Sequence, residues 1–233
     1  MRDEPHHSDL AIQLDDVHVR LASAAGEVNI LRGLNLHVTR GETVGIVGPS
    51  GGGKSTMLMV IAGLERTASG VVRTAGIDLT KLDEDALARF RRDHVGIVFQ
   101  DFHLISTMTA LENVAVPLEF AGRADAFERA RESLSAVGLS HRLLHYPGQL
   151  SGGEQQRVAI ARAFATQPDI LLADEPTGNL DSEIGRQVMD LLFSLHAERG
   201  MTLLLISHDP ALAERCGRVV HLADGLIDGE TVR

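Results

Sequence analysis

Residues 48–56 read Gly-Pro-Ser-Gly-Gly-Gly-Lys-Ser-Thr and satisfy the pattern Gly-x-x-x-x-Gly-Lys-Ser. The apolar run Thr43 to Val47 precedes them and another apolar stretch follows, so the pattern stands between an expected strand and an expected helix. In that context backbone N–H groups can wrap phosphates, Lys54 can reach the β- and γ-phosphates, and the Ser55 hydroxyl can ligate Mg²⁺. The predicted members of this nucleoside-triphosphate site are Gly48, Pro49, Ser50, Gly51, Gly52, Gly53, Lys54, Ser55 and Thr56.

A second helix start of similar character lies further along the chain. The segment Leu150 to Glu154 reads Leu-Ser-Gly-Gly-Glu, and Ser151 with Glu154 forms a Ser-x-x-Glu capping box. Glycine lets the backbone approach a ligand closely, and the first N–H groups of a helix attract anions. Ser151, Gly152, Gly153 and Glu154 are therefore a second candidate phosphate contact. Spacing alone does not exclude that both loops meet one nucleotide within a chain.

Two acidic residues follow another apolar run. Residues 170–173 read Ile-Leu-Leu-Ala and deliver Asp174 and Glu175 at their C-terminal end, where open α/β sheets bind ligands. We expect Asp174 to partner Mg²⁺ through water, because Mg²⁺ keeps several of its waters. Glu175 would then hold or deprotonate the attacking water. The alternative is an acidic pair on the surface, which rarely follows an apolar strand so directly.

Two further polar residues end apolar runs. His208 follows the run Thr202 to Ile206 and could contact the γ-phosphate and the water. Gln100 follows the run that begins at Val95, and its neutral amide could touch Mg²⁺ or water. Taken alone, a histidine in this position is more often a capping or loop residue, and the glutamine is unremarkable.

Composition limits the classes of protein that this chain can belong to. It has 233 residues, 44% of them hydrophobic, and a formal net charge of −10. This length suits one domain with a helical insertion better than two complete domains. The acidity argues against nucleic-acid partners, because neutralising phosphates requires clustered Lys and Arg. Apolar runs such as Met57 to Leu64 fall short of the ~20 residues that span a bilayer, so any membrane role is expected to come through a partner.

The periodicity of apolar residues predicts an α/β fold. Residues 43–47, 95–99, 170–173 and 202–206 indicate four buried strands. Ahead of them, alternating apolar positions predict an antiparallel β portion. Its members are Ile12, Leu14, Val17, Val19 and Leu21, with a one-residue register change, and then Leu34, Leu36 and Val38.

Residues 82–166 are predicted to form a helical subdomain inserted into this core, which comprises about residues 9–81 and 167–233 of a single domain, 1–233. Thr109 with Glu112 is a possible capping box, and Pro117 and Gly122 would kink and close the helix that follows. Downstream, apolar residues recur at helical spacing, namely Phe127, Ala130, Leu134 and Val137.

In their order and spacing, these segments resemble the ATP-binding subunit of an ABC transporter. The residues that carry the resemblance are Gly48–Thr56, Gln100, Leu150–Gln156, Asp174–Thr177, Asn179–Asp181 and His208. The resemblance covers nearly the whole chain. It implies a P-loop NTPase fold and an activity that hydrolyses ATP with Mg²⁺. It identifies His208 as the switch histidine, Gln100 as the Q-loop glutamine and Asp181 as the D-loop aspartate, which communicates across a dimer.

The resemblance also gives the second helix start a role. In this family the segment that matches Ser151 to Glu154 faces the γ-phosphate of ATP held by the partner subunit, so a homodimer would enclose two ATP molecules head to tail. The Mg²⁺ ligands that it implies are Ser55, Gln100 and Asp174. The catalytic residues that it implies are Lys54, Glu175 and His208.

Within the family, residues 111–118, 150–162 and 173–181 resemble the subgroup that drives lipoprotein release and macrolide export. This subgroup works with an integral membrane permease, which implies a location at the cytoplasmic face of the bacterial inner membrane without direct membrane insertion. Residues 102–104, just after Gln100, are candidates for the permease-facing groove.

Three other functions are compatible with parts of the pattern. An importer of small solutes remains an alternative within the transporter class. An ABC-type ATPase acting on DNA or ribosomes is disfavoured by the acidity and by the lack of room for coiled coils, zinc modules or a second ATPase half. A regulator that binds nucleotide without hydrolysis is disfavoured by the intact Lys54, Asp174, Glu175 and His208.

The sequence departs from the family at the nucleotide base. Family members usually place an aromatic side chain near the end of the first strand to stack on adenine, whereas Leu21 takes that place here. Stacking on an aromatic contributes ~1–3 kcal/mol per base, and the phosphate site offers several charge-assisted hydrogen bonds of ~1.5–3 kcal/mol each. We therefore expect ATP to bind with poor discrimination against GTP. His18 is an alternative stacking residue.

Overall fold

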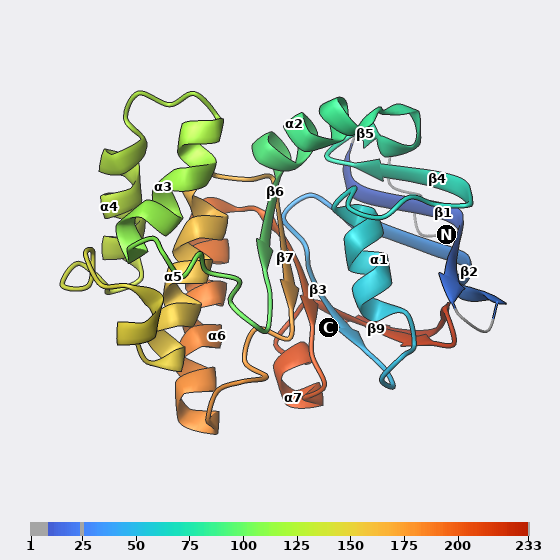
Figure 1. Cartoon of the computed structure of the whole chain (residues 1–233). Helices are drawn as coiled ribbons and strands as arrows, with labels where there is room; N and C mark the ends of the chain where they lie inside the picture. Colours follow the sequence, from blue (N-terminus) through green and yellow to red (C-terminus); the bar gives the residue numbers. More distant parts are fainter. Residues whose placement is uncertain (1–8, 24–25, 233) are drawn as a thin grey trace. The chain divides into compact units, whose positions relative to one another are not determined.

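The computed structural model describes residues 9–23 and 26–232 (Figure 1). The chain divides into two compact units: residues up to Arg91 together with those from Met201 onward, and residues Arg92–Gly200. These divisions differ from residues 82 and 166, between which the sequence predicts the helical insertion. Each unit holds part of the predicted site, and each is described separately.

The first unit begins with the predicted antiparallel β portion. Its sheet has the order β2-β1-β4-β5. The strands are β1 (Leu10–Ser23), β2 (Gly26–Thr39), β4 (Ser69–Thr74) and β5 (Ile77–Asp78). The predicted register change in β1 is confirmed, because the pairing with β2 shifts between Leu14 and Val17, and Asp16 has a φ of 49°. The alternating apolar residues of both strands are buried in the core, except Leu21, which is exposed near the end of β1.

A second set of strands in this unit has the order β10-β9-β3-β8. Its members are β3 (Thr43–Val47), β8 (Thr202–Ile206), β9 (Arg218–Ala223) and β10 (Leu226–Val232). Strand β3 runs parallel to both β8 and β9, so the two predicted core strands in this unit are confirmed. Helix α1 (Lys54–Ile61) follows β3 and contacts β2 and β4. The short helices are η2 (Leu79–Lys81) and α7 (Pro210–Ala213), and α2 (Glu84–His94) runs on into the second unit.

The second unit combines a parallel strand pair, β6 (Val95–Val98) and β7 (Ile170–Asp174), with helices. The helices are α3 (Ala110–Phe120), α4 (Ala126–Ala136), η3 (Pro147–Gln149), α5 (Gly152–Ala165) and α6 (Ser182–Arg199). Helices α3, α4 and α5 pack on one another, as the green to yellow coils of Figure 1 show, and α5 also contacts β6 and α6.

The predicted helix boundaries of this unit are confirmed in detail. Thr109 and Ser151 each form a complete capping box, at the starts of α3 and α5. Pro117 lies inside α3, and Gly122, with a φ of 68°, follows its end. The predicted helical spacing of Phe127, Ala130, Leu134 and Val137 is confirmed by α4, although Phe127 is 40% exposed and Ala126 is buried. Position 127 lies at the margin of the stripe that positions 126, 130, 134 and 137 share on a helix of 3.6 residues per turn.

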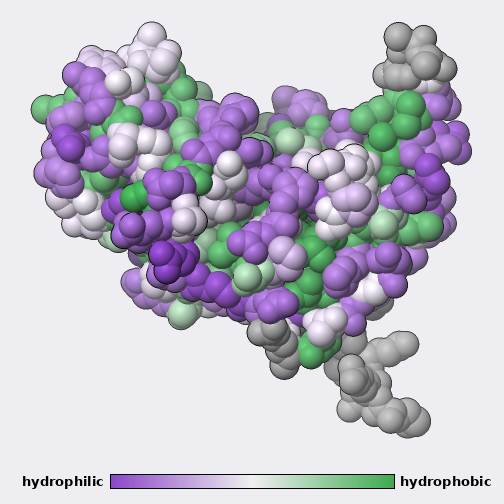
Figure 2. Space-filling view, turned by 90° about the horizontal axis from the view of Figure 1, so that it is seen from below, coloured by the Kyte–Doolittle hydropathy of each residue, from purple (hydrophilic) through white to green (hydrophobic). Residues whose placement is uncertain are grey.

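The polar character of the surface agrees with the composition. The face drawn in Figure 2 is largely hydrophilic, with apolar residues in small separate areas. No helix in the described part of the chain is long and apolar enough to cross a membrane.

Candidate functional site

The predicted phosphate loop occupies the turn between β3 and α1. After Val47 the chain passes through three glycines with positive φ, Gly48 at 149°, Gly51 at 78° and Gly53 at 99°, before α1 begins. The need for glycine is strictest at Gly48, where a Cβ atom would lie 1.9 Å from the carbonyl oxygen of Leu222. The loop therefore packs directly against β9 at a position that admits no side chain.

Lys54, the first residue of α1, points back into this loop. Its Nζ donates to the carbonyl oxygens of Gly48 at 2.9 Å and Pro49 at 2.8 Å, and the residue is 6% exposed. The N-terminus of a helix is partly positive, and the first turn of α1 contains no acidic residue. The buried ammonium, the helix start and the loop N–H groups together make a site suited to a phosphate chain.

His208 lies at the same edge of the sheet as the phosphate loop. It follows β8, which is parallel to β3, and Ser207 donates its backbone N–H to the carbonyl of Ile46 at 3.2 Å. Asp209 caps α7 by accepting a hydrogen bond from the backbone N–H of Ala211 at 2.9 Å. The histidine is exposed and sits between two anchored residues, at the edge where the sequence predicts it.

In the second unit, Asp174 is the last residue of β7 and Glu175 begins the turn that follows. Glu175 has a φ of 48°, and its carbonyl accepts a hydrogen bond from the N–H of Gly178 at 3.0 Å. Left-handed backbone in a residue other than glycine costs ~1–3 kcal/mol and concentrates at functional sites. The turn thus holds Glu175 in a backbone conformation that an ordinary loop would avoid.

Gln100 lies on the same turn system, two residues after β6. Its Nε2 donates to Oδ1 of Asn179 at 3.2 Å, and Asn179 Nδ2 donates to the Gln100 carbonyl at 3.2 Å and to Asp101 Oδ1 at 2.8 Å. Because β6 and β7 are parallel, Gln100 and Asp174 follow the same edge of this strand pair. Three hydrogen bonds therefore join the segment after β6 to the segment that leads into α6.

The segment Ser151 to Glu154 is held by a network of charged and neutral groups. Ser151 donates its backbone N–H and its hydroxyl to Glu154 Oε2 at 2.8 and 2.9 Å, and Arg142 Nε donates to Oε1 at 2.8 Å. These bonds, led by that from the Ser151 N–H, lower the pKa of the Glu154 carboxyl to about 2. Ser151 itself is exposed, so the start of α5 is accessible to a ligand.

Asp181 is the N-cap of α6. Its Oδ1 accepts hydrogen bonds from the backbone N–H groups of Glu183 at 3.1 Å and Ile184 at 2.9 Å. These two hydrogen bonds fix the Asp181 side chain at the start of α6.

Three residues near these segments received no individual role in the sequence analysis. Asn179 ties Gln100 to the loop before α6, Gln156 is fully buried and bonds the carbonyl of Pro176, and Arg162 bonds two carbonyls that follow Gln100. Gln156 precedes Ala159 by three residues and Ile160 by four, so it lies on an apolar face of the helix. A polar residue on such a face indicates a buried polar contact. The partner of that contact is not readable from the sequence.

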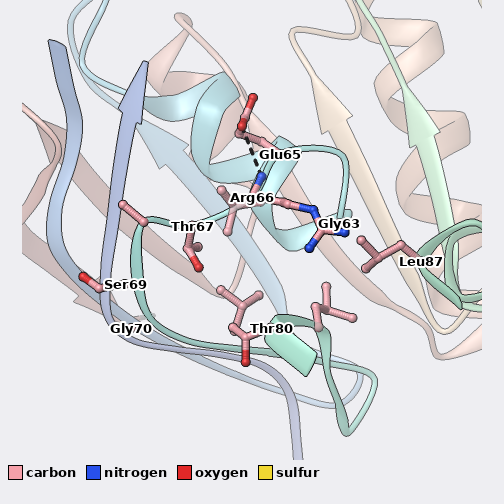
Figure 3. A pocket seen from close by; sticks show the side chains of 12 residues that line it. Gly63, Glu65, Arg66, Thr67, Ser69, Gly70, Thr80 and Leu87 are labelled. Atoms are coloured by element: carbon pink, nitrogen blue, oxygen red, sulfur yellow. Dashed lines mark hydrogen bonds between the residues drawn. The ribbon is translucent and has the colours of Figure 1, made fainter. Parts of the chain in front are cut away.

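A separate cavity of 240 Å³ lies in the first unit (Figure 3). Its lining includes Gly63, Arg66, Thr80 and Leu87, and Arg66 extends its guanidinium toward Leu87. The cavity begins at Val60, which is about 9 Å along α1 from Lys54 at 1.5 Å per residue. It contains none of the predicted site residues and lies beyond the phosphate loop.

Comparison with known protein families gives a match that includes the phosphate loop. Residues 31–178 match the family described as ABC transporter. This match covers more than half of the 233 residues, and the chain belongs to that family.

Individual relatives extend the match to most of the chain. The ABC transporter ATP-binding protein YbbA of Escherichia coli K12 is 50% identical over 217 residues, which are 91% of this chain and 95% of YbbA. The lipoprotein-releasing system ATP-binding protein LolD of Geobacter metallireducens is 50% identical over 93% of this chain and 97% of LolD. The macrolide export ATP-binding/permease protein MacB of Escherichia coli K12 is 45% identical over 93% of this chain, which is 34% of MacB.

Solved structures confirm the predicted fold class. The dimeric ATP-binding cassette MJ0796 in a post-hydrolysis state, bound to ADP and Pi, matches with a TM-score of 0.88 and 42% identity, over 95% of this chain and 98% of that one. A further dimeric structure of MJ0796 also has a TM-score of 0.88, with 43% identity. The fold is therefore the α/β P-loop NTPase fold of an ABC ATPase.

Proposed function

We propose that this protein is an ATP-hydrolysing subunit that powers a membrane permease of the lipoprotein-release or macrolide-export type. The observation that carries the ATP-binding part is the enclosure of Lys54 by the carbonyls of Gly48 and Pro49 at the start of α1. A loop and lysine of this kind suit the β- and γ-phosphates of a nucleoside triphosphate. The ADP and Pi bound to the related MJ0796 cassette support the assignment.

The proposal assigns hydrolysis to Glu175, His208 and Lys54. Glu175 takes the proton from the attacking water, whose oxygen bonds to the γ-phosphorus while the bond to the β–γ bridging oxygen breaks. His208 contacts the γ-phosphate, and Lys54 with the loop N–H groups stabilises the negative charge that is redistributed onto the leaving ADP. The left-handed backbone of Glu175 supports a functional reading of that turn.

The donors assigned to Mg²⁺ have the chemistry that this ion prefers. They are the hydroxyl of Ser55, the amide oxygen of Gln100 and the carboxylate of Asp174, an all-oxygen set. Gln100 donates to Asn179 through Nε2, so its Oε1 is the atom assigned to the metal. Bound to these residues, Mg²⁺ would neutralise charge on the β- and γ-phosphate oxygens.

We assign the segment Ser151 to Glu154, whose first residue is exposed, to the ATP of a second copy of this chain. Its capping box leaves the other N–H groups of the helix start for an anion. The dimeric structures of the MJ0796 cassette support a dimeric arrangement. In this assignment Asp181, held as the cap of α6, contributes to communication between the copies.

The transport class rests on the names of the relatives. LolD is named for lipoprotein release, and MacB joins ATP-binding and permease functions in one protein. We infer that this chain docks on a permease at the cytoplasmic face of the bacterial inner membrane, with residues 102–104 toward it. Cargo contacts would lie in the permease. An importer of small solutes is the alternative, which the identity of a co-purified permease distinguishes.

The test has two arms. Purified protein should release phosphate from ATP in the presence of Mg²⁺, and Lys54→Ala should abolish that release. Protein isolated gently from its native membranes should carry an integral permease with it. A purified, folded chain that binds ATP and never releases phosphate would instead support a non-hydrolysing regulator.

A further inference from the structure

The segment after Gln100 contains an unusual turn. Phe102 and His103 are consecutive and have φ values of 56° and 49°. Residues other than glycine rarely adopt the left-handed region of backbone conformation. Two consecutive residues in that region are rarer than a single one. Something outside the turn must therefore hold it.

Arg162, near the end of α5, supplies that hold. Its Nη1 donates to the carbonyl of His103 at 2.6 Å and its Nη2 donates to the carbonyl of Phe102 at 2.8 Å. The planar fork of a guanidinium matches two neighbouring acceptors, and bonds from a charged donor are the stronger kind. Burial lowers the pKa of Arg162, but a guanidinium keeps its charge in proteins.

The same turn lies close to the start of α5, the segment that the proposed function assigns to the ATP of a second copy. A Cβ atom on Gly152 would lie 3.3 Å from Leu180 Cδ2 and 3.9 Å from Phe102 Cζ. The rings of Phe99 and His103 also meet edge to face, with centroids 4.9 Å apart. Helix α5 thus contacts the turn at both ends, through Gly152 at its start and Arg162 near its end.

We propose that Arg162 is a positioning residue for Gln100, which it acts on by holding the left-handed turn at Phe102 and His103. Through the two hydrogen bonds of Arg162, the position of Gln100 is set relative to α5, and therefore relative to Ser151 at the start of that helix. The inference rests on the proposed function, in which Gln100 and Ser151 both act on ATP. It adds a residue that contacts neither ATP nor metal.

The test relieves the strain of the turn independently of Arg162. Three purified proteins are compared with the unaltered chain: Arg162→Gln, the double variant Phe102→Gly/His103→Gly, and the triple variant that combines them. Glycine adopts the left-handed region without penalty, so a turn made of glycine needs less support. Arg162→Lys, which keeps the charge without the fork, and Arg131→Gln, an exposed arginine of α4, are the controls.

We expect Arg162→Gln to lower kcat for ATP hydrolysis at least about tenfold, with the Kd for ATP little changed. The triple variant should recover about half or more of the lost turnover, Arg162→Lys should fall between, and Arg131→Gln should match the unaltered protein. Thermal unfolding identifies any variant whose loss of activity is a loss of folded protein.

Equal losses in Arg162→Gln and in the triple variant, with both folded, would overturn the proposal, since Arg162 would then act by packing alone. A fall in ATP affinity that matches the fall in turnover would also overturn it. Absence of ATPase activity in the unaltered protein would contradict the proposed function instead, so the two failures are distinguishable.

Discussion

The side chain of Gln156 donates from Nε2 to the main-chain carbonyl of Pro176 at 2.6 Å, and the residue is completely buried. The same nitrogen lies 3.5 Å from the carbonyl of Phe99. Pro176 directly follows Glu175, so this bond ties α5 to the turn that carries the proposed general base. The Oε1 atom of Gln156 has no hydrogen-bond partner within the described chain.

Replacing Gln156 tests how much this bond stabilises the protein. Gln156→Met keeps the length of the side chain and removes the donor, so the free energy of unfolding should fall by about 1–3 kcal/mol. Gln156→Glu should cost more, because it places a buried carboxylate against carbonyl oxygens. Chemical denaturation measures both, and Gln187→Met, at an exposed position of α6, is the control. A carboxylate variant as stable as the methionine variant would show that the carbonyl contact is unimportant.

Features that depend on neighbouring residues in the sequence were predictable. The strands at Thr43–Val47 and Thr202–Ile206 have the predicted bounds, because short apolar runs bounded by polar residues mark buried strands. The capping boxes at Thr109 and Ser151 were readable for the same reason, since each needs only residues three apart. The phosphate loop belongs to this group as well.

Features that depend on tertiary packing were not predictable. Arg162 meets the carbonyl of Phe102 across a separation of 60 residues, and no local pattern announces that contact. The left-handed φ of Glu175 and His103 is likewise held by the surrounding structure against the preference of the residue. The roles of Glu175, His208 and Gln100 in hydrolysis stay predictions until they are measured.

The assignment of Glu175 as general base makes a kinetic prediction. Glu175→Gln keeps the size of the side chain but cannot accept the proton, so hydrolysis should slow by ~10²–10⁴-fold while ATP binding is retained. Single-turnover phosphate release and equilibrium nucleotide binding separate the two quantities. Glu198→Gln, at an exposed position of α6, should leave both unchanged. Normal turnover in Glu175→Gln would remove this residue from the mechanism.

Because Ser151 is assigned to the ATP of a second copy, a substitution there should affect dimerisation without affecting the binding of ATP to the phosphate loop. Ser151→Arg places a long cationic side chain at an exposed helix start, so ATP should still bind to the phosphate loop, whereas ATP-dependent dimerisation and turnover should be lost. Sedimentation with and without ATP measures assembly. The matched control is Ser194→Arg, an exposed serine of α6. Hydrolysis by a strictly monomeric variant would show that one chain suffices.

The network around Glu154 predicts a dependence of stability on pH. Its pKa is lowered from 4.5 to about 2 in the folded protein, so the folded state binds this proton less readily than the unfolded state does. The stabilising contribution is therefore complete above pH 4.5 and is lost as the pH falls toward about 2. The difference in unfolding free energy between the unaltered protein and Glu154→Gln should shrink across that interval. A Glu132→Gln control, at an exposed position of α4, should show a smaller change.

This chain has Leu21 at the position where members of its family usually place an aromatic residue against the nucleotide base. Leu21 pairs with Val28 across β1 and β2, and both are exposed, at 37% and 44%. Further along β2, Ile30 and Leu31 line the phosphate loop, because a Cβ atom on Gly53 would lie 3.0 Å from Leu31 Cδ2 and 3.2 Å from the Ile30 carbonyl oxygen. Leu21 and Val28 therefore form an aliphatic surface only a few residues along the strand from that loop, where each residue spans about 3.3 Å.

An aliphatic surface packs against any base without the stacking energy of an aromatic ring. We therefore expect ATP and GTP to compete for this protein with similar Kd values, and Leu21→Tyr to tighten ATP binding by about 1–3 kcal/mol, the range for stacking of one base. Competition binding with both nucleotides measures this, and Val232→Tyr, an exposed position of β10, controls for a non-specific aromatic effect. A strong preference for ATP in the unaltered protein would mean that another group reads the base. His18 would be the first candidate, although its ring nitrogen already contacts Asp16 at 3.1 Å.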